Sequence, residues 1–369
     1  MASITRFGMS ILETCSSEHS SGNKQGQHLN GVNRVLLLAS AHKVIENRNN
    51  VSVLWHAVGL NDIKCSLSVD HKMNNLLFGI QSHSCKYSCH ICDSPNPKTP
   101  GQDWEESDLR TLGSIRKNCT DWRNSGSEPK KANKYKNCVS FPVFNDPDET
   151  LCLAVCPLSE LHLLLRIVNH LYKNLKKAWT QVIEAECMNG NGDGSENSPS
   201  EILHPADKWA IACGAMQRKF HGGVFNGNGC NKLLSDPGLH LLQQFLPPVL
   251  FDYLHCFRMF AQVKMACFGT TLSPNTFECI TKFKQAFLNL EINVTPTVHI
   301  VFAHISDFVK YNQENELGNH GLGVWSEQCF ETMHQESDTV IQRFPVNQYS
   351  ESFPQRSLRA LCFFNSTHI

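Results

Sequence analysis

Two pairs of residues in this sequence have the types and spacing of zinc ligands. Cys89 and Cys92 form a Cys-x2-Cys pair, and two cysteines at this spacing can grip one Zn²⁺ from a tight turn. His299 and His304 follow about 200 residues later, five positions apart. Because the chain has no second Cys-x2-Cys pair, the preferred interpretation is one Cys2His2 site whose halves come from distant segments.

Both pairs also have an ordinary interpretation. A single Cys-x2-Cys occurs in thioredoxin-like redox motifs as well as in metal sites, so the spacing does not decide between them. Two histidines five positions apart are commonly core or surface residues without a ligand. On spacing alone the ordinary interpretation is favoured for the histidines, and the two interpretations are about equal for the cysteines.

Three acidic residues could bind divalent metal ions for phosphoryl transfer. Asp70 follows the alternating segment Ile63–Val69, which predicts a strand, and precedes a predicted helix. Glu327 and Glu331 lie four positions apart at the start of another predicted helix and share one face. Carboxylates at such element ends bind Mg²⁺ in two-metal sites. The chemistry alone nevertheless favours a helix N-cap for Asp70 and helix-dipole compensation for the two glutamates.

A basic stretch between Ile115 and Lys136 could follow a phosphate backbone. Its seven cationic residues are Arg116, Lys117, Arg123, Lys130, Lys131, Lys134 and Lys136. Trp122 and Tyr135 are interleaved with them and could stack on bases. The commoner case is a solvated loop.

A second polar block could also contact phosphate. Asn226 and Asn228 flank a glycine just before Lys232, so the block resembles a loop at a helix N-terminus that offers backbone N–H groups. The same pattern is a plain turn followed by an N-cap.

Length and composition limit the classes of protein. The 369 residues, 41% hydrophobic and 18% charged, are enough for one large domain or two coupled ones. A formal net charge of −1 excludes a protein that coats nucleic acid by bulk charge. No apolar run reaches the roughly 18 residues of a membrane span, and the start lacks a signal-peptide core. The sequence therefore predicts an intracellular chain whose 17 cysteines are reduced thiols or metal ligands.

The elements that must position these residues follow from hydrophobic periodicity. The apolar run Val35–Ala39 predicts a buried strand, and Ser10–Leu12 predicts a weaker one. The strongest helix prediction is Leu158–Val182, where leucines and a valine form one stripe. A polar, Gly-rich loop is expected near residues 187–200. Further helices are predicted over Asn50–Val58, Met73–Ile80, Pro205–Met216, Leu239–Phe245, Val249–Phe268, Pro274–Leu290, Thr297–Val309, from Ser326 onward and over Ser357–Phe364.

Six segments in order resemble the catalytic core of the V(D)J recombinase large subunit and of Transib-type transposases. They resemble still more closely the transposon-derived proteins scattered through invertebrate genomes. The segments are VDHKMNNLLFGIQSHSCKYSCHICD, RTLGSIRKNCTDWRN, FNGNGCNKLL, HIVFAHISDFV, GLGVWSEQCFETMH and RSLRALCFFNSTHI. Eighteen residues separate Asp70 from Cys89, a gap typical of the family. The resemblance spans roughly Gly31 to Ile369.

The resemblance implies an α/β (α+β) fold, a truncated RNase H-like sheet with a large, mostly helical, zinc-bearing insertion. It divides the chain into a partial α/β region over 1–84, the insertion over 85–310, and a region over 311–369 that completes the sheet. By this resemblance Cys89, Cys92, His299 and His304 are the zinc ligands. Asp70 is the second catalytic acid and Glu331 the third, with Glu327 as the runner-up.

One departure from the family concerns the first catalytic Asp, which lies on the central strand of its sheet. Among Glu13, Glu18, Glu46 and Asp62, none follows a hydrophobic strand in the family's manner. The first strand and its Asp are expected to be missing, together with the family's N-terminal DNA-binding part. Two-metal catalysis should then be lost or nearly lost.

The sequence therefore predicts a transposase-derived, nuclear protein that is catalytically inactive as written. We expect structural Zn²⁺, residual DNA binding and a possible homodimer, with no membrane association. DNA contacts are expected from Arg116, Lys117, Arg123, Lys130, Lys131, Asn226, Asn228 and Lys232. Mg²⁺ or Mn²⁺ would be the ancestral catalytic ions. The alternatives are an active nuclease or transposase whose first acid lies elsewhere, and a zinc-stabilised protein-interaction scaffold.

Overall fold

The computed structural model describes residues 5–10, 35–41, 48–57, 67, 69–82, 84–189, 203–215, 217, 224–326, 355–356, 359 and 362. Internal contacts divide the chain into two compact units. Unit 1 takes the described residues of Met1–Ser82, Arg110–Pro157 and Val324–Ile369, and unit 2 those of His83–Leu109 and Leu158–Gly323. These boundaries differ from the expected division after residues 84 and 310, because segment 110–157 contacts the N-terminal elements. For example, Ile80 forms a β-bridge with Cys138.

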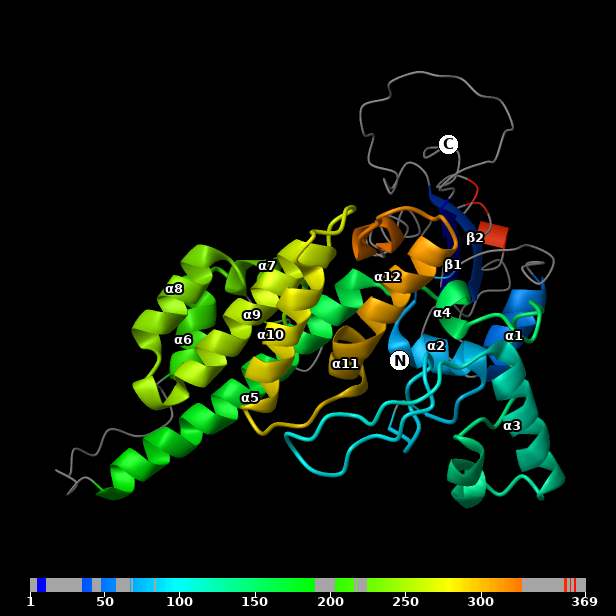
Figure 1. Cartoon of the computed structure of the whole chain (residues 1–369). Helices are drawn as coiled ribbons and strands as arrows, with labels where there is room; N and C mark the ends of the chain where they lie inside the picture. The colour runs from blue at the N-terminus through cyan, green and yellow to red at the C-terminus, as the bar shows by residue number, and fades with distance from the viewer. Residues whose placement is uncertain are drawn as a thin grey trace. The chain divides into compact units, whose positions relative to one another are not determined.

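Unit 1 combines one pair of strands with short helices (Figure 1). Strands β1 (Thr5–Ser10) and β2 (Val35–Ala41) pair antiparallel, with a register irregularity between Phe7 and Gly8. The helical elements are α1 (Arg48–Ala57), α2 (His71–Phe78), α3 (Leu112–Asn124), the 3-10 helix η3 (Pro129–Tyr135) and α4 (Cys152–Val155).

The helices of unit 1 meet around a small aromatic core. The Phe144 ring contacts Trp55 of α1 edge-on at 5.4 Å and Phe78 of α2 at 5.1 Å. Arg48, at the start of α1, donates hydrogen bonds to the carbonyl oxygens of Asn75, Leu76 and Ile80. Its guanidinium thus adds a second donor to the carbonyl oxygens of Asn75 and Leu76, which also accept from the Ile80 and Gly79 N–H groups, and ties α1 to the C-terminal end of α2.

The prediction of an α/β RNase H-like sheet is wrong. The described residues are mostly helical, and their only sheet is the two-stranded β1–β2 pair. The apolar run Val35–Ala39 does form a strand, but an apolar run indicates strand character without specifying its partners. The predicted strand Ile63–Val69 lies outside the described residues except for Leu67 and Val69, and neither of these is in a strand.

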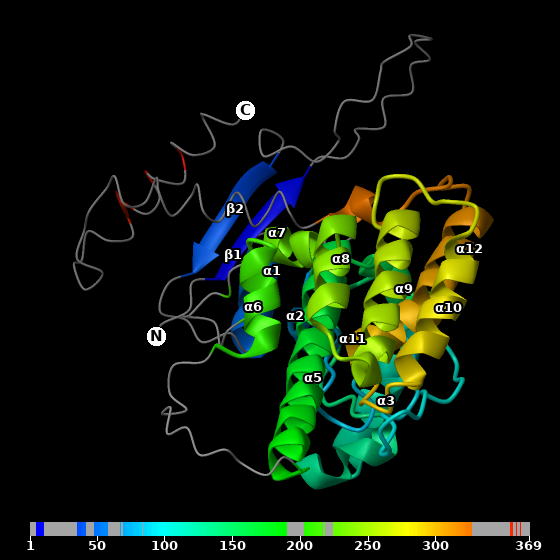
Figure 2. The same ribbon diagram turned by 90° about the vertical axis from the view of Figure 1, so that its left-hand side faces the viewer.

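Unit 2 is a bundle of helices around α5 (Glu160–Asn189) (Figure 2). Leu164, Val168, Leu171 and Leu175 of its predicted stripe are buried, whereas Leu161 and Leu165 are half-buried. The other helices are α6 (Pro205–Ala212), α7 (Gly227–Leu233), α8 (Asp236–Phe245), α9 (Phe251–Cys267) and α10 (Thr276–Leu288), with the 3-10 turn η5 (Pro248–Leu250) before α9. Most of the predicted Gly-rich loop lies outside the described residues.

The last helical segment of unit 2 is continuous from Pro296 to Glu314. It comprises α11 (Pro296–His299), a π-helical turn η6 (Ile300–His304) and α12 (Ile305–Glu314). Thr295 caps its start by accepting a hydrogen bond from the Val298 N–H, and Pro296 occupies the first turn, where its missing N–H costs nothing. The 3-10 turn η7 (Leu322–Trp325) follows.

Aromatic packing fixes this segment against α9 and α10. The ring of Phe283 lies 5.0 Å from Phe260, 5.8 Å from Phe287 and 5.6 Å from Phe302. Each fully buried phenylalanine contributes about 1.5–3 kcal/mol relative to an exposed one. Phe302 lies between the two histidines in the sequence, so this cluster also fixes where they point. Among the helices that the structure describes, none combines the length and the apolar character that crossing a membrane requires.

Candidate metal centre

The cysteine half of the site lies in an irregular loop of unit 2. Cys92 forms a β-bridge with Leu109, and the Asp93 N–H donates to the Asp108 carbonyl. The Ile91 N–H donates to Cys89 Sγ at 3.4 Å. This bond helps to fix the Cys89 sulfur in the turn and favours its thiolate, in opposition to burial.

The histidine half depends on the π-helical turn. In a regular α-helix, residues five positions apart point about 140° apart around the axis. In η6 the Ile305 N–H donates to the Ile300 carbonyl, a step of five residues that widens the turn. His299 and His304 consequently point to the same side, and their ring centroids are 4.7 Å apart. Such turns are frequent at functional sites.

The two halves meet in the interior of unit 2. Cys92 Sγ lies 3.2 Å from His299 Nε2, and Cys89 Sγ lies 3.4 Å from His304 Nε2. The four potential ligand atoms all lie within 4.8 Å of one another. A tetrahedral zinc ion with bonds near 2.0–2.3 Å has its ligand atoms roughly 3.3–3.8 Å apart. The cluster is therefore close to the size that a metal ion needs, and the four residues could hold one.

The cluster is closed to solvent. The exposed fractions are 0% for Cys89, 2% for Cys92, 4% for His299 and 2% for His304. Trp104 covers one side, with its ring stacked on His299 at 4.1 Å and its indole N–H donating to the Val294 carbonyl at 3.0 Å. Four buried protein donors leave no position for a substrate, as is typical of structural rather than catalytic metal sites.

Burial and hydrogen bonding shift the ionisation of the four side chains. Hydrogen bonding with Cys89, joined by His299 and His304, outweighs burial and holds the pKa of Cys92 far below its ordinary range. Burial raises the pKa of Cys89 and lowers that of His299. Burial opposes protonation of His304, but hydrogen bonds to Asp307 and Cys92 outweigh it and raise the His304 pKa. Metal binding requires deprotonated thiols and neutral imidazoles. The low pKa of Cys92 favours its deprotonated thiol.

The acidic residues are described only in part. Asp70 caps α2, where its Oδ1 accepts a hydrogen bond from the Met73 N–H at 2.7 Å. This is the ordinary role that the chemistry favoured. Glu327 and Glu331 lie outside the described residues, so their expected approach to Asp70 stays a prediction.

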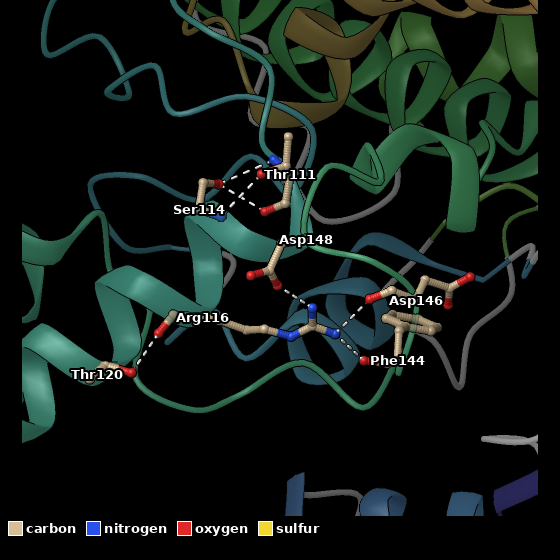
Figure 3. A network of polar contacts seen from close by, with 7 residues as sticks. All are labelled: Thr111, Ser114, Arg116, Thr120, Phe144, Asp146 and Asp148. Atoms are coloured by element: carbon tan, nitrogen blue, oxygen red, sulfur yellow. Dashed lines mark hydrogen bonds and ion pairs between the residues drawn. The ribbon is translucent and has the colours of Figure 1, made fainter.

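Arg116 is held by contacts within unit 1 (Figure 3). It lies on α3, whose first turn is fixed by a capping box between Thr111 and Ser114. Its Nη1 pairs with the Asp148 carboxylate at 2.5 Å, and its Nη2 donates to the carbonyl oxygens of Phe144 and Asp146 at 2.7 and 3.0 Å. Arg116 thus ties α3 to the 144–148 loop, and these bonds would have to break before it could bind phosphate.

Four other residues predicted to contact DNA also have partners within their own unit. The Arg123 guanidinium lies 4.3 Å from the Phe141 ring centroid, and Lys131 pairs with Glu128 at 2.8 Å. Asn226 caps α7 through the Gly229 N–H, and Lys232 donates to the Gly214 carbonyl. Arg123, Lys131 and Lys232 are exposed despite these contacts, and Lys117, Lys130 and Asn228 are exposed as well.

Sequence reasoning missed two neighbours of the metal cluster. Trp104 stacks on His299, and Asp307 Oδ2 lies 2.8 Å from His304 Nδ1. For Asp307 a signal was present, since an acid three positions after a histidine on a helix lies on the same face. Trp104 is 195 positions from His299, and no local pattern predicts that contact.

Comparison with known proteins adds no relative. A scan against protein-family models and a search of curated proteins each found no match to this chain. Its function is therefore inferred from its own residues.

Proposed function

We propose that Cys89, Cys92, His299 and His304 bind one structural Zn²⁺. Two thiolates and two imidazoles in a closed tetrahedral set are characteristic zinc ligands. The observation that carries the proposal is the convergence of all four donor atoms within 4.8 Å in a buried site.

The zinc ion would fasten two parts of unit 2 that are far apart in the sequence. One part is the irregular loop around residues 85–109, which has few helical hydrogen bonds of its own. The other is the α11–η6–α12 segment, which is fixed by the aromatic cluster. Because ligands this distant do not form a site in the unfolded chain, zinc binding would add directly to the stability of the folded state.

We further propose that the chain is a transposase-derived nuclear protein with residual DNA binding. The resemblance to V(D)J recombinase and Transib-type transposases picked out the same four ligands that lie together in unit 2, which supports a common descent. The exposed Lys117 and Lys130 of unit 1 suit phosphate contacts, which need only local positive charge. We expect no metal-dependent cleavage from the residues of this sequence, because none of Glu13, Glu18, Glu46 and Asp62 follows a hydrophobic strand as the family's first acid does.

A zinc-stabilised protein-interaction scaffold is the second candidate. Large apolar side chains are exposed where α8 leads through η5 into α9. Phe245 is 41% exposed, Val249 70% and Phe251 41%. Apolar side chains gathered in one segment of the surface can mark contact with another protein.

The zinc proposal is tested by metal analysis of the purified full chain. One zinc per chain is expected, with loss of that zinc in Cys92→Ser and retention in Cys187→Ser, which changes an exposed cysteine. A chain that carries no zinc when purified and takes up none afterwards would contradict the proposal.

The DNA proposal is tested by titrating the full chain with a mixed-sequence duplex at several salt concentrations. We expect weak binding that declines with salt and a shallower salt slope in Lys117→Ala/Lys130→Ala. Incubation with Mg²⁺ or Mn²⁺ tests cleavage, with Asp70→Ala as the control. Cleavage that disappears in that control would identify an active enzyme, whereas neither binding nor cleavage would favour the scaffold.

A further inference from the structure

Asp307 contacts the metal cluster without belonging to it. It lies in the first turn of α12, three positions after His304, and its Oδ2 is 2.8 Å from His304 Nδ1. The His304 side chain is 3% exposed and the Asp307 side chain 27%, so this contact lies at the boundary between the cluster and solvent. The other ring nitrogen of His304, Nε2, faces Cys89 Sγ at 3.4 Å.

This arrangement has a consequence for the tautomer of His304. A neutral imidazole carries one proton, and the nitrogen without it offers the lone pair that a metal binds. An ionised carboxylate only accepts hydrogen bonds, so the proton of His304 belongs on Nδ1, facing Asp307. The lone pair of Nε2 then points into the cluster. The same contact also fixes the rotation of the ring about its χ angles.

The two histidine ligands are oriented by different means. His299 is held by the flat Trp104 ring, stacked 4.1 Å away with an interplanar angle of 8°, and Trp104 is itself fixed through the Val294 carbonyl. A stacked ring restrains the plane of an imidazole but does not select its tautomer. At His304 the carboxylate does both, so a change at Asp307 should affect the metal more specifically than a loss of packing would.

We propose that Asp307 is a positioning residue of the metal centre, which sets the tautomer and orientation of His304 and thereby strengthens zinc binding. This inference rests on the proposed zinc function. Hydrogen-bond partners of ligand histidines typically change metal affinity by about 10- to 100-fold. We expect an effect of that size at Asp307, together with faster release of zinc.

A purely structural role for Asp307 must be separated from this one. An acid in the first turn of α12 also compensates the helix dipole, and its loss would weaken the helix without touching the histidine. Ser306→Asp/Asp307→Ala keeps an acid in that turn but removes it from His304. Glu314→Ala removes an exposed acid from the other end of the same helix and serves as the matched control.

The experiment measures zinc affinity of the full chain by competition with a chromophoric chelator, and zinc release after adding excess chelator. Asp307→Ala and the double variant should both bind zinc about 10- to 100-fold more weakly, and Glu314→Ala should match the wild type. NMR of the zinc-loaded wild type, with labelled histidines, should show the His304 proton on Nδ1. If the alanine variants fail to fold, Asp307→Asn replaces them. We expect a smaller but measurable loss of zinc affinity in this variant.

Two results would overturn the inference while leaving the zinc proposal intact. One is an affinity of Asp307→Ala within twofold of the wild type, and the other is recovery of wild-type affinity in the double variant. A wild-type chain that binds no zinc would instead overturn both.

Discussion

Cys92 and His299 are separated by 207 positions in the chain, yet Cys92 Sγ lies 3.2 Å from His299 Nε2. Neither residue is placed by local structure alone. The loop around Cys92 is shaped by backbone contacts to residues 108 and 109, and His299 by the helix that begins at Thr295. The contact between Cys92 and His299 therefore joins the Cys92 loop to the last helical segment of unit 2.

Removing zinc should destabilise unit 2. A ligand present at a thousand times its Kd stabilises the folded state by about 4 kcal/mol, so chelation or Cys92→Ser should lower the unfolding free energy by an amount of that order. Thermal unfolding with and without chelator measures the effect. Cys187→Ser is the control, because Cys187 is exposed. Equal melting temperatures with and without chelator would show that the cluster does not hold a structural metal.

The sequence predicted the helices of unit 2 better than the sheet of unit 1. Apolar side chains three and four positions apart indicate α5 directly, because the period of a helix can be recognised within a short stretch of sequence. The helix continues past the predicted end at Val182 to Asn189, through residues such as Glu184 and Ala185 that favour helix without adding to the stripe. The apolar run of β2 predicted a strand equally well. Its antiparallel pairing with β1 depends on contacts between distant residues, which no local pattern predicts.

The candidate site was likewise predictable where local sequence determines it and unpredictable where contacts between distant residues do. The spacing of Cys89 and Cys92 indicated half of a metal site, but a five-residue step between histidines fits one face only with the π-helical turn, which the sequence did not predict. The basic stretch was predicted from charge alone. Charge does not reveal that Arg116 is bound to the 144–148 loop, since its partners Phe144 and Asp146 contribute backbone oxygens that every residue has.

Truncating the aromatic cluster should weaken unit 2 and its metal centre together. Phe283 is fully buried, and its ring contacts Phe260, Phe287 and Phe302. Replacing a buried phenylalanine by alanine costs about 3–5 kcal/mol, so Phe283→Ala should lower the unfolding free energy by that much. Because Phe302 lies between His299 and His304, zinc affinity should decline as well.

The control for Phe283 lies on the same helix. Phe277 is 46% exposed, so Phe277→Ala should change the unfolding free energy far less. Chemical denaturation of the three proteins, followed by tryptophan fluorescence, measures the difference. Equal losses for the two variants would contradict the assignment of Phe283 to the core.

Alanine substitutions at the adjacent residues Arg116 and Lys117 should have different effects on stability. Arg116 donates to two carbonyl oxygens and pairs with Asp148, so Arg116→Ala should cost about 1–3 kcal/mol of stability. Lys117 is exposed, so Lys117→Ala should leave stability nearly unchanged and weaken DNA binding. Denaturation and duplex titration of both variants test this. Unchanged stability in Arg116→Ala would contradict the role given to its contacts.

Asp207 should make unit 2 sensitive to acid. It lies in the first turn of α6, where its Oδ1 accepts from the Tyr172 hydroxyl at 2.5 Å and its Oδ2 pairs with Lys176 at 2.6 Å. Burial opposes ionisation of this carboxyl, but the bonds from Lys176 and Tyr172 outweigh burial and lower the Asp207 pKa. The folded state therefore holds the carboxylate more strongly than the unfolded chain does.

The sign of the pH effect follows from this shift. Since the pKa of Asp207 is lower in the folded state, its stabilisation is complete above the ordinary carboxyl pKa of about 3.9 and is lost as the pH falls below it. Asp207→Asn should cost about 1–3 kcal/mol at pH 7, and its gap in unfolding free energy from the wild type should stay constant down to about pH 4 and narrow below it. Urea unfolding across that range measures the gap. Asp252→Asn, which changes an exposed acid in the first turn of α9, is the matched control. Because both variants keep the four metal ligands, any acid-induced loss of metal is common to them and cancels in the comparison. A gap between Asp207→Asn and the wild type that stays constant with pH would show that Asp207 does not carry this acid sensitivity.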